Sequence, residues 1–411
     1  MIKVQSQDGL MQAERGEQRP HMPPAKLIVF SIISLFMAVL GFCIVSEVIL
    51  RILPLGRYEN GIYRQYDPLL GESLIPNVGV IHSRGCFQGL VRTNSWAFRD
   101  RDRTLEKPPE AFRVALIGDS AIEAAQVQPN EVVNIQMEQM LHDQGYPRVE
   151  VLAFGIGAIG TTQELLLYEN KIRQFHPDVV VLTFSANDVM NNSSTLQPET
   201  YGIHTWYSPY YDLGTNGELV FRPVESKPLN WLVKPLEHHS KLLYYFERVW
   251  FQFDYSPYKW HGVPIYYGTW SDDPLDPDWQ QAWNITSKVL ARFDREVSAD
   301  GGRFLVLAWP NFYDIDTAWR RSLLKEIGTM PAQLNPAKFS DHLRDAAQKA
   351  NVPLDFTAPY FQAYRDEHHL QWPYFSFSCD PHLSSMGHRI AAAAIIQKLE
   401  EYKLLPPKVT E

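Results

Sequence analysis

The chain has 411 residues, of which 45% are hydrophobic and 21% charged, so it can form a large core and wholesale disorder is excluded. Its formal charge of −9, from 38 Lys and Arg against 47 Asp and Glu, argues against a nucleic-acid-binding protein. The three cysteines, Cys43, Cys86 and Cys379, are too few for a disulfide-dense scaffold or a metal site of four thiolates.

Residues 27–45 (LIVFSIISLFMAVLGFCIV) carry no charge and, as a helix, would span about 30 Å, the thickness of a bilayer core. The run is apolar all round, whereas a buried core helix of this length usually keeps a polar stripe. A cleaved signal peptide is disfavoured, because the run is long and no small-x-small site follows it. We therefore predict a transmembrane helix over 27–50, preceded by a tail of residues 1–26.

The tail predicts the orientation of this helix. It contains Lys3, Arg15, Arg19 and Lys26, and the positive-inside rule places such a segment in the cytoplasm. The rest of the chain would then be extracytoplasmic, in the periplasm or at the cell surface. Cys86 and Cys379 lie in this extracytoplasmic part, where they could form a disulfide or remain two thiols.

Residues 51–110 have short alternating runs and turn residues, which predicts a β-rich lead-in. From 111 to about 405, apolar runs alternate with helix-periodic segments. Such a pattern predicts a three-layer α/β fold with a parallel sheet covered by helices on both faces. The expected strands are 113–119, 148–154, 177–188, 303–309 and 352–356, and the expected helices 130–144, 161–175 and 385–402.

One segment, at about 190–285, interrupts this alternation. It is rich in Trp, Tyr and Pro and contains one strongly helical stretch, SKLLYYFERVWFQF. It could form a lid or a sugar-stacking surface over the site, or a cover of packed aromatic residues.

Ligands of parallel α/β sheets bind at the carboxyl ends of the strands. Ser120 follows the first strand directly, within IGDSAIEA, and is a candidate nucleophile. A serine nucleophile needs a base, and the base needs a partner that orients it. Asp380 and His382 lie two residues apart in an expected loop before the last helix, and we predict them to be that pair. His388, inside the helix, is expected to be a packed histidine.

A third polar group follows the third strand. Asn187 in SANDVMNN could donate its side-chain amide to an oxyanion, and Asp188 is expected to hold the loop through local backbone hydrogen bonds.

These blocks resemble the SGNH hydrolases, also called the GDSL family, which are flavodoxin-like α/β esterases and acyltransferases. GDS at 118–120, SAND at 185–188 and DPH at 380–382 match in order, and the resemblance covers about residues 110–403. It implies that Ser120 is the nucleophile, His382 the base, Asp380 its partner and Asn187 an oxyanion donor. The lead-in RTNSWAFRDRD is similar to a segment of membrane-anchored bacterial members, often linked to surface polysaccharides.

The chain departs from the family in its second block, usually N-x-G-x-x-G. Here Ala153 occupies the position of the leading Asn. Ala158 occupies the position of the last glycine, whose N–H serves the oxyanion in the family. A backbone N–H does not require glycine if φ stays negative. A one-residue shift of the loop could instead present Gly157. Ala124 also stands where relatives often have glycine.

Residues 155–160 form a G-x-G-x-x-G motif between a strand and a helix, a dinucleotide-binding fingerprint. However, the motif follows the second strand, and Asp178 begins the next strand where the fingerprint needs an acid at a strand end. We therefore expect these glycines to allow close backbone approach, and we expect no cofactor. No H-E-x-x-H or clustered Cys/His set predicts a metal.

Together with the resemblance to the SGNH hydrolases, the sequence predicts a membrane-anchored serine esterase that hydrolyses a small acyl ester. The resemblance and the aromatic insertion favour O-acetyl on a carbohydrate as the substrate. Two alternatives remain: an O-acyltransferase in surface-polysaccharide assembly, and a catalytically degenerate domain that binds polysaccharide. The sequence indicates neither the acyl donor and acceptor nor the oligomeric state.

Overall fold

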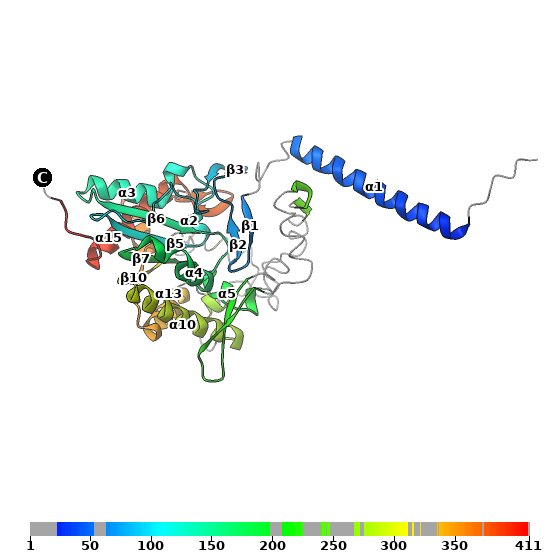
Figure 1. The fold of residues 1–411 in the computed structure, drawn as a ribbon. Helices are drawn as coiled ribbons and strands as arrows, with labels where there is room; N and C mark the ends of the chain where they lie inside the picture. Colours follow the sequence, from blue (N-terminus) through cyan, green and yellow to red (C-terminus); the bar gives the residue numbers. More distant parts are fainter. Residues whose placement is uncertain are drawn as a thin grey trace, which may run out of the picture. The chain divides into compact units, whose positions relative to one another are not determined.

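A computed structural model describes the protein over residues 23–52, 63–197, 208–224, 240–243, 245–246, 267–271, 275–310, 315, 321, 335, 337–371 and 374–409. The chain divides into two compact units, residues 1–53 and 54–411 (Figure 1).

The first unit contains one long helix, α1 (Pro24–Ile52), none of whose residues is buried. Its mean hydropathy over an 18-residue window is 2.8, and it is the one helix of the described chain long and apolar enough to cross a membrane. A signal sequence near the N-terminus can pass the same test of length and hydropathy. The predicted helix is present, and both its crossing of a membrane and its orientation there remain predictions.

The second unit is built on a parallel sheet of five strands: β5 (Phe112–Gly118), β6 (Val149–Gly155), β7 (Val179–Phe184), β10 (Arg303–Ala308) and β11 (Leu354–Phe356). The strand order is β11-β10-β7-β5-β6. The first strand of this sheet, β5, therefore lies between the second, β6, and the third, β7, which is the flavodoxin-like order. All five predicted strands and the predicted fold class are confirmed.

The sheet is buried on both faces because its strands are continuous apolar runs. In β5, Val114 and Leu116 face one core cluster, and Ala115 and Ile117 face the other; all four are fully buried. Figure 1 shows the covering helices. The first cluster is closed by α3 (Val133–Asp143), α14 (Ala358–Glu367) and α15 (Ser385–Glu401), the second by α4 (Thr161–Asn170), α10 (Pro277–Ala299) and α13 (Lys338–Ala350).

Two expected helices are shorter than predicted. The expected helix 130–144 begins with a separate 3₁₀ turn, η1 (Pro129–Glu131), before α3. The expected helix 161–175 ends at Asn170, and a second 3₁₀ turn, η2 (Ile172–Phe175), follows it.

The insertion predicted at about 190–285 overlaps a helix that covers the sheet. Helix α10 already begins at Pro277, where Asp276 caps it by accepting a hydrogen bond from the Asp278 N–H. Before α10, the described part of the insertion contains α5 (Asp188–Asn191), the hairpin β8 (Tyr210–Leu213) with β9 (Leu219–Arg222), and α9 (Tyr267–Trp270). The expected helical stretch 240–253 lies mostly outside the described residues.

Four described aromatic residues of the range 190–285 belong to the core, whereas Phe221 and Phe246 are exposed. Tyr211, Trp270, Trp279 and Trp283 are each at most 7% exposed and join the cluster beneath α10. These four residues therefore agree with the second interpretation of the segment, in which its aromatic residues pack against the core.

The lead-in forms two antiparallel hairpins, β1 (Arg64–Asp67) with β2 (Gly71–Leu74), and β3 (Gly79–Arg84) with β4 (Phe87–Arg92). A disulfide joins Cys86, in the β3–β4 turn, to Cys379, with their Cα atoms 5.9 Å apart. Beside it the rings of Phe87 and Phe377 lie 5.1 Å apart. The structure therefore contains the disulfide, the first of the two alternatives for these cysteines.

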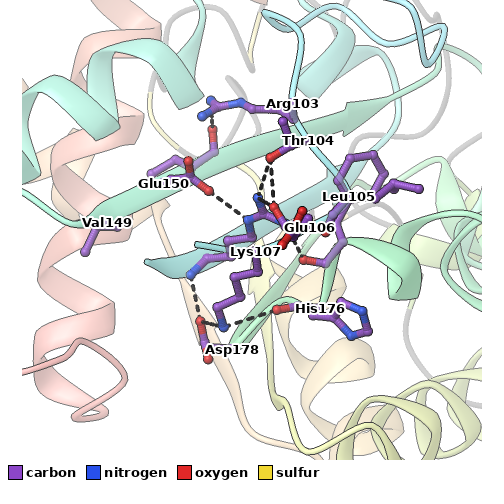
Figure 2. Close-up of polar contacts among 12 residues, drawn as sticks. Arg103, Thr104, Leu105, Glu106, Lys107, Val149, Glu150, His176 and Asp178 are labelled. Carbon is purple, nitrogen blue, oxygen red and sulfur yellow. Dashed lines mark hydrogen bonds and ion pairs between the residues drawn. The ribbon is translucent and has the colours of Figure 1, made fainter. Parts of the chain in front are cut away.

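Ion pairs lie at the amino ends of the strands, and one of them comes from the end of the lead-in (Figure 2). Lys107 Nζ donates to Asp178 Oδ2 (2.5 Å) and to the carbonyl oxygen of His176 (3.3 Å). Arg113, 1% exposed, donates to Glu150 Oε2 at 2.7 Å. The polar residues predicted to carry chemistry lie at the opposite, carboxyl end of the sheet.

Candidate active site

Ser120 is the first residue of the short helix α2 (Ser120–Glu123), directly after β5. Asp119 caps this helix, since its side chain accepts a hydrogen bond from the Ala121 N–H at 2.9 Å. Gly118 makes the tight turn possible: a Cβ there would lie 2.1 Å from Thr183 Oγ1 and 2.7 Å from Ile122 Cγ1. The sequence Gly-Asp-Ser therefore fixes where the serine hydroxyl emerges from the sheet.

The structure brings Ser120, His382 and Asp380 together. His382 Nε2 lies 2.8 Å from Ser120 Oγ, and His382 Nδ1 lies 2.6 Å from Asp380 Oδ1. The serine and the histidine are 262 positions apart in the chain. The expected loop before the last helix is instead a short strand, β13 (Asp380–Leu383), paired with β12 (Ser376–Phe377). Pairing with β12 gives this segment a defined backbone.

Burial and neighbouring charges shift the pKa of His382 in opposite directions. Burial lowers its pKa, but the hydrogen bond and charge of Asp380, with smaller contributions from Asp119 and Glu123, raise it above the usual value. The Asp380 side chain is 3% exposed, so its charge is little screened by water, whereas the His382 side chain is 31% exposed. This environment stabilises an imidazolium, the species formed when the ring takes a proton from Ser120 Oγ.

Asn187 lies between β7 and α5, close to the serine turn. Its side-chain amide donates to Asp119 Oδ2 at 2.9 Å, and Ser185 Oγ donates to Asp119 Oδ1 at 3.3 Å. Asp188 accepts the Ser185 N–H at 2.8 Å, so it holds the loop through a local backbone bond as predicted. An amide has two N–H groups, and no hydrogen bond among the described residues uses the second one of Asn187.

Of the two backbone donors proposed from the second block, Gly157 is engaged elsewhere. Its N–H donates to Glu123 Oε2 at 2.5 Å, so it cannot serve an oxyanion in this conformation. The N–H of the next residue, Ala158, has no acceptor among the described residues, and Ala158 is exposed. Ala158 is therefore the stronger candidate.

The sequence predicts that alanine replaces glycine without difficulty at position 158 if its φ is negative, but φ is positive there. Ala158 has φ of +67°, and Ala124 has φ of +52°. Both are positions where the resemblance leads one to expect glycine, and the left-handed conformation explains why glycine suits them. Alanine adopts this conformation at a cost of about 1–2 kcal/mol.

The G-x-G-x-x-G motif serves packing. A Cβ on Gly155 would lie 2.2 Å from the Glu123 backbone nitrogen, and one on Gly160 would lie 2.6 Å from Asn191 Cβ. Asp178, the acid considered for a ribose, instead binds Lys107 at the amino end of the sheet. The glycines let the turn after β6 approach α2 and α5 closely, as expected.

The described part of the chain contains neither a second candidate catalytic histidine at position 388 nor a candidate metal site. His388 is 2% exposed within α15, and burial, with the charges of Arg99 and His382, lowers its pKa to about 3. It is therefore a neutral, packed histidine. Among the described residues, no group of three or more His, Cys, Asp or Glu side chains is placed to hold a metal ion.

The sequence did not identify three residues that surround the serine turn. Glu123 is 1% exposed, and Arg64 forms an ion pair with it at 2.6 Å. Arg99 donates to the carbonyl oxygens of Glu123 (3.1 Å) and Leu90 (3.0 Å), and also to those of Ala124 and Val127. Arg99 lies in RTNSWAFRDRD, so the similarity of that segment to family members pointed to the segment, although not to Arg99 itself. No local pattern points to the pairing of Arg64 with Glu123.

No protein-family model and no curated protein sequence matches the chain. Solved structures with similar folds include a lipase/acylhydrolase from Enterococcus faecalis (13% identity, TM-score 0.37, 73% of this chain and 100% of that one). Others are a catalytic mutant of an acetylxylan esterase from Geobacillus stearothermophilus (13%, 0.36, 72% and 96%) and a GDSL-like lipase from Bacteroides thetaiotaomicron (13%, 0.34, 72% and 92%). Similarities at this level assign no substrate to this chain.

Proposed function

We propose that this chain is a serine esterase of the SGNH hydrolase type, in which Ser120, His382 and Asp380 form the catalytic triad. The observation that carries the proposal is the pair of contacts through one imidazole, 2.8 Å to Ser120 Oγ and 2.6 Å to Asp380 Oδ1. The base is thus within hydrogen-bond reach of the nucleophile on one side and of the orienting carboxylate on the other, as acyl transfer requires.

In the first step Ser120 Oγ attacks the acyl carbonyl carbon, and its proton passes to His382 Nε2. Asp380 holds Nδ1–H and stabilises the imidazolium. The negative charge that develops on the carbonyl oxygen is met by the backbone N–H groups of Ser120 and Ala158 and by the second amide N–H of Asn187. The imidazolium then protonates the departing alcohol oxygen, and an acyl-enzyme remains.

In the second step water attacks the acyl-enzyme. His382 takes a proton from that water and returns it to Ser120 Oγ, so the carboxylic acid leaves and the enzyme is restored. A sugar hydroxyl in place of water would convert the same site into an acyltransferase. The chemistry before the acyl-enzyme is identical in the two cases, so only the acceptor distinguishes them.

The proposed substrate is a small acyl ester, with O-acetyl on a carbohydrate favoured by the resemblance to polysaccharide-associated members of the family. We propose further that α1 anchors the protein in a membrane and that residues after it are extracytoplasmic. The basic residues of the tail favour this orientation. The disulfide between Cys86 and Cys379 also supports it, since such bonds persist in oxidising compartments.

The test incubates the full-length protein in detergent with acetylated xylo-oligosaccharide, with and without an excess of unacetylated oligosaccharide. Release of free acetate that is lost in Ser120→Ala supports the esterase. Acetyl transfer to the added sugar without free acetate would replace it with the acyltransferase. Neither product from folded protein, with oligosaccharide still bound, would favour a binding domain.

A further inference from the structure

Glu123 is a buried carboxylate that none of the proposed chemical steps uses. It lies three residues after Ser120 in α2 and is 1% exposed. It accepts the Gly157 N–H at 2.5 Å and the Tyr63 hydroxyl at 3.2 Å. A carboxylate so far from water needs compensation for its charge.

Arg64, from the first lead-in strand, supplies that charge. Its Nη2 donates to both carboxylate oxygens of Glu123, at 2.8 and 2.6 Å. Its Nη1 donates to the Gly157 carbonyl oxygen at 3.2 Å and to Glu72 at 2.5 Å. One residue of the loop after β6 is therefore held on both sides, its N–H by Glu123 and its C=O by Arg64.

The loop that is held this way lies against the nucleophile. A Cβ on Gly157 would come within 3.4 Å of Ser120 Cβ, 3.1 Å of Glu123 Oε2 and 2.7 Å of Arg64 Nη2. The peptide unit that follows Gly157 carries the Ala158 N–H. Arg64 thus binds the C=O of the same peptide unit, and Glu123 binds the N–H of the unit before it.

We propose that Arg64 and Glu123 are positioning residues, which hold the loop 156–159 so that the Ala158 N–H points at the oxyanion. This inference rests on the proposed esterase function. It makes the lead-in part of the active site, because Arg64 belongs to the lead-in strand β1. A donor works only if it is preorganised where the charge develops, and deletion of one such donor reduces kcat by about 10²–10³. Loss of its support should cost less, about 10- to 100-fold.

The variants are Arg64→Lys, Arg64→Gln and Glu123→Gln. A lysine keeps the charge opposite Glu123 but is a single point donor that cannot hold the carboxylate and the Gly157 carbonyl in the fork geometry of arginine. Arg64→Lys should therefore fold even where Arg64→Gln, which leaves a buried charge unpaired, does not. The matched control is Arg113→Lys, since Arg113 also forms an ion pair with a glutamate in which one partner is buried, but this pair lies at the amino end of the sheet.

The readouts are kcat and KM on 4-nitrophenyl acetate and amide hydrogen exchange of the segment 155–160, all on the full-length protein in detergent. We expect Arg64→Lys to lower kcat about 10-fold or more, with KM changed less than threefold, and to speed exchange at 155–160 but not in β5. Arg113→Lys should change neither. Unchanged exchange and kcat would overturn the inference, and a raised KM with unchanged kcat would assign Arg64 to substrate binding instead.

Failure of the proposed function gives a different result. If the wild-type protein neither hydrolyses the ester nor forms an adduct with a fluorophosphonate, the esterase is wrong. The exchange measurement still decides whether the Arg64–Glu123 pair holds the loop.

Discussion

Cys379, which a disulfide joins to Cys86 of the lead-in, directly precedes Asp380, the residue that holds His382 at 2.6 Å. The bond connects positions 293 residues apart, so it ties the beginning of the second unit to its final part. The lead-in therefore contacts the site from two directions, through this disulfide at Asp380 and through Arg64 at the loop after β6.

Removing the disulfide should affect both stability and turnover. For the variant with Cys86→Ser and Cys379→Ser we expect the free energy of unfolding to fall by about 2–5 kcal/mol, because a long loop is no longer closed in the unfolded chain. Turnover should fall as well, since Asp380 loses its restraint. Urea denaturation with and without dithiothreitol measures the first effect, and Cys43→Ser is the control because Cys43 is unpaired. Equal stability of the double variant and the wild type would contradict the prediction.

The pH dependence of kcat/KM should report His382. The ring must be neutral to take the proton from Ser120, so activity rises as pH increases through its pKa. Asp380 raises that pKa, so the acidic limb should lie above the value of about 6.5 for an unperturbed histidine. Asp380→Asn should move the limb to lower pH and reduce kcat by up to about 10⁴-fold. His388→Gln is the control, because His388 is already neutral in this range and should leave the limb in place.

Replacing Ala158 by glycine should stabilise the protein. Its φ of +67° suits glycine, so Ala158→Gly removes backbone strain, and we expect a gain of about 0.5–1 kcal/mol after the entropy of the freer unfolded chain is subtracted. Thermal unfolding measures the gain. Ala97→Gly, at φ of +65° and outside the site, should give a similar gain without changing kcat. A loss of stability in Ala158→Gly would show that the alanine is not strained there.

The central sheet was predictable because each strand is a continuous apolar run buried on both faces. The same pattern places Ser120 and Asn187 after strands, at the edge where the structure brings them together with the residues of β13. Helix α10 was missed because the aromatic insertion concealed it, although Asp276 and Pro277 form a helix-start signal. Helix α13 was also missed, although Phe339, Leu343 and Ala346 repeat at helical spacing.

Other features depend on tertiary structure and leave no local signal. The ion pair of Arg64 with Glu123 joins segments 59 positions apart, and nothing in either segment specifies the other. The engagement of the Gly157 N–H by Glu123 follows from that packing, so the choice between Gly157 and Ala158 could not be made from the second block alone. The positive φ of Ala158 likewise arises from the path of the loop between β6 and α4.

The most direct test of the account is labelling of the full-length protein in detergent with a fluorophosphonate, followed by mapping of the adduct by mass spectrometry. Such a probe reacts with a serine that a neighbouring base has activated. We predict a single adduct on Ser120, absent in Ser120→Ala and strongly slowed in His382→Ala. No adduct on folded wild-type protein, or equally fast labelling of His382→Ala, would contradict the proposed triad.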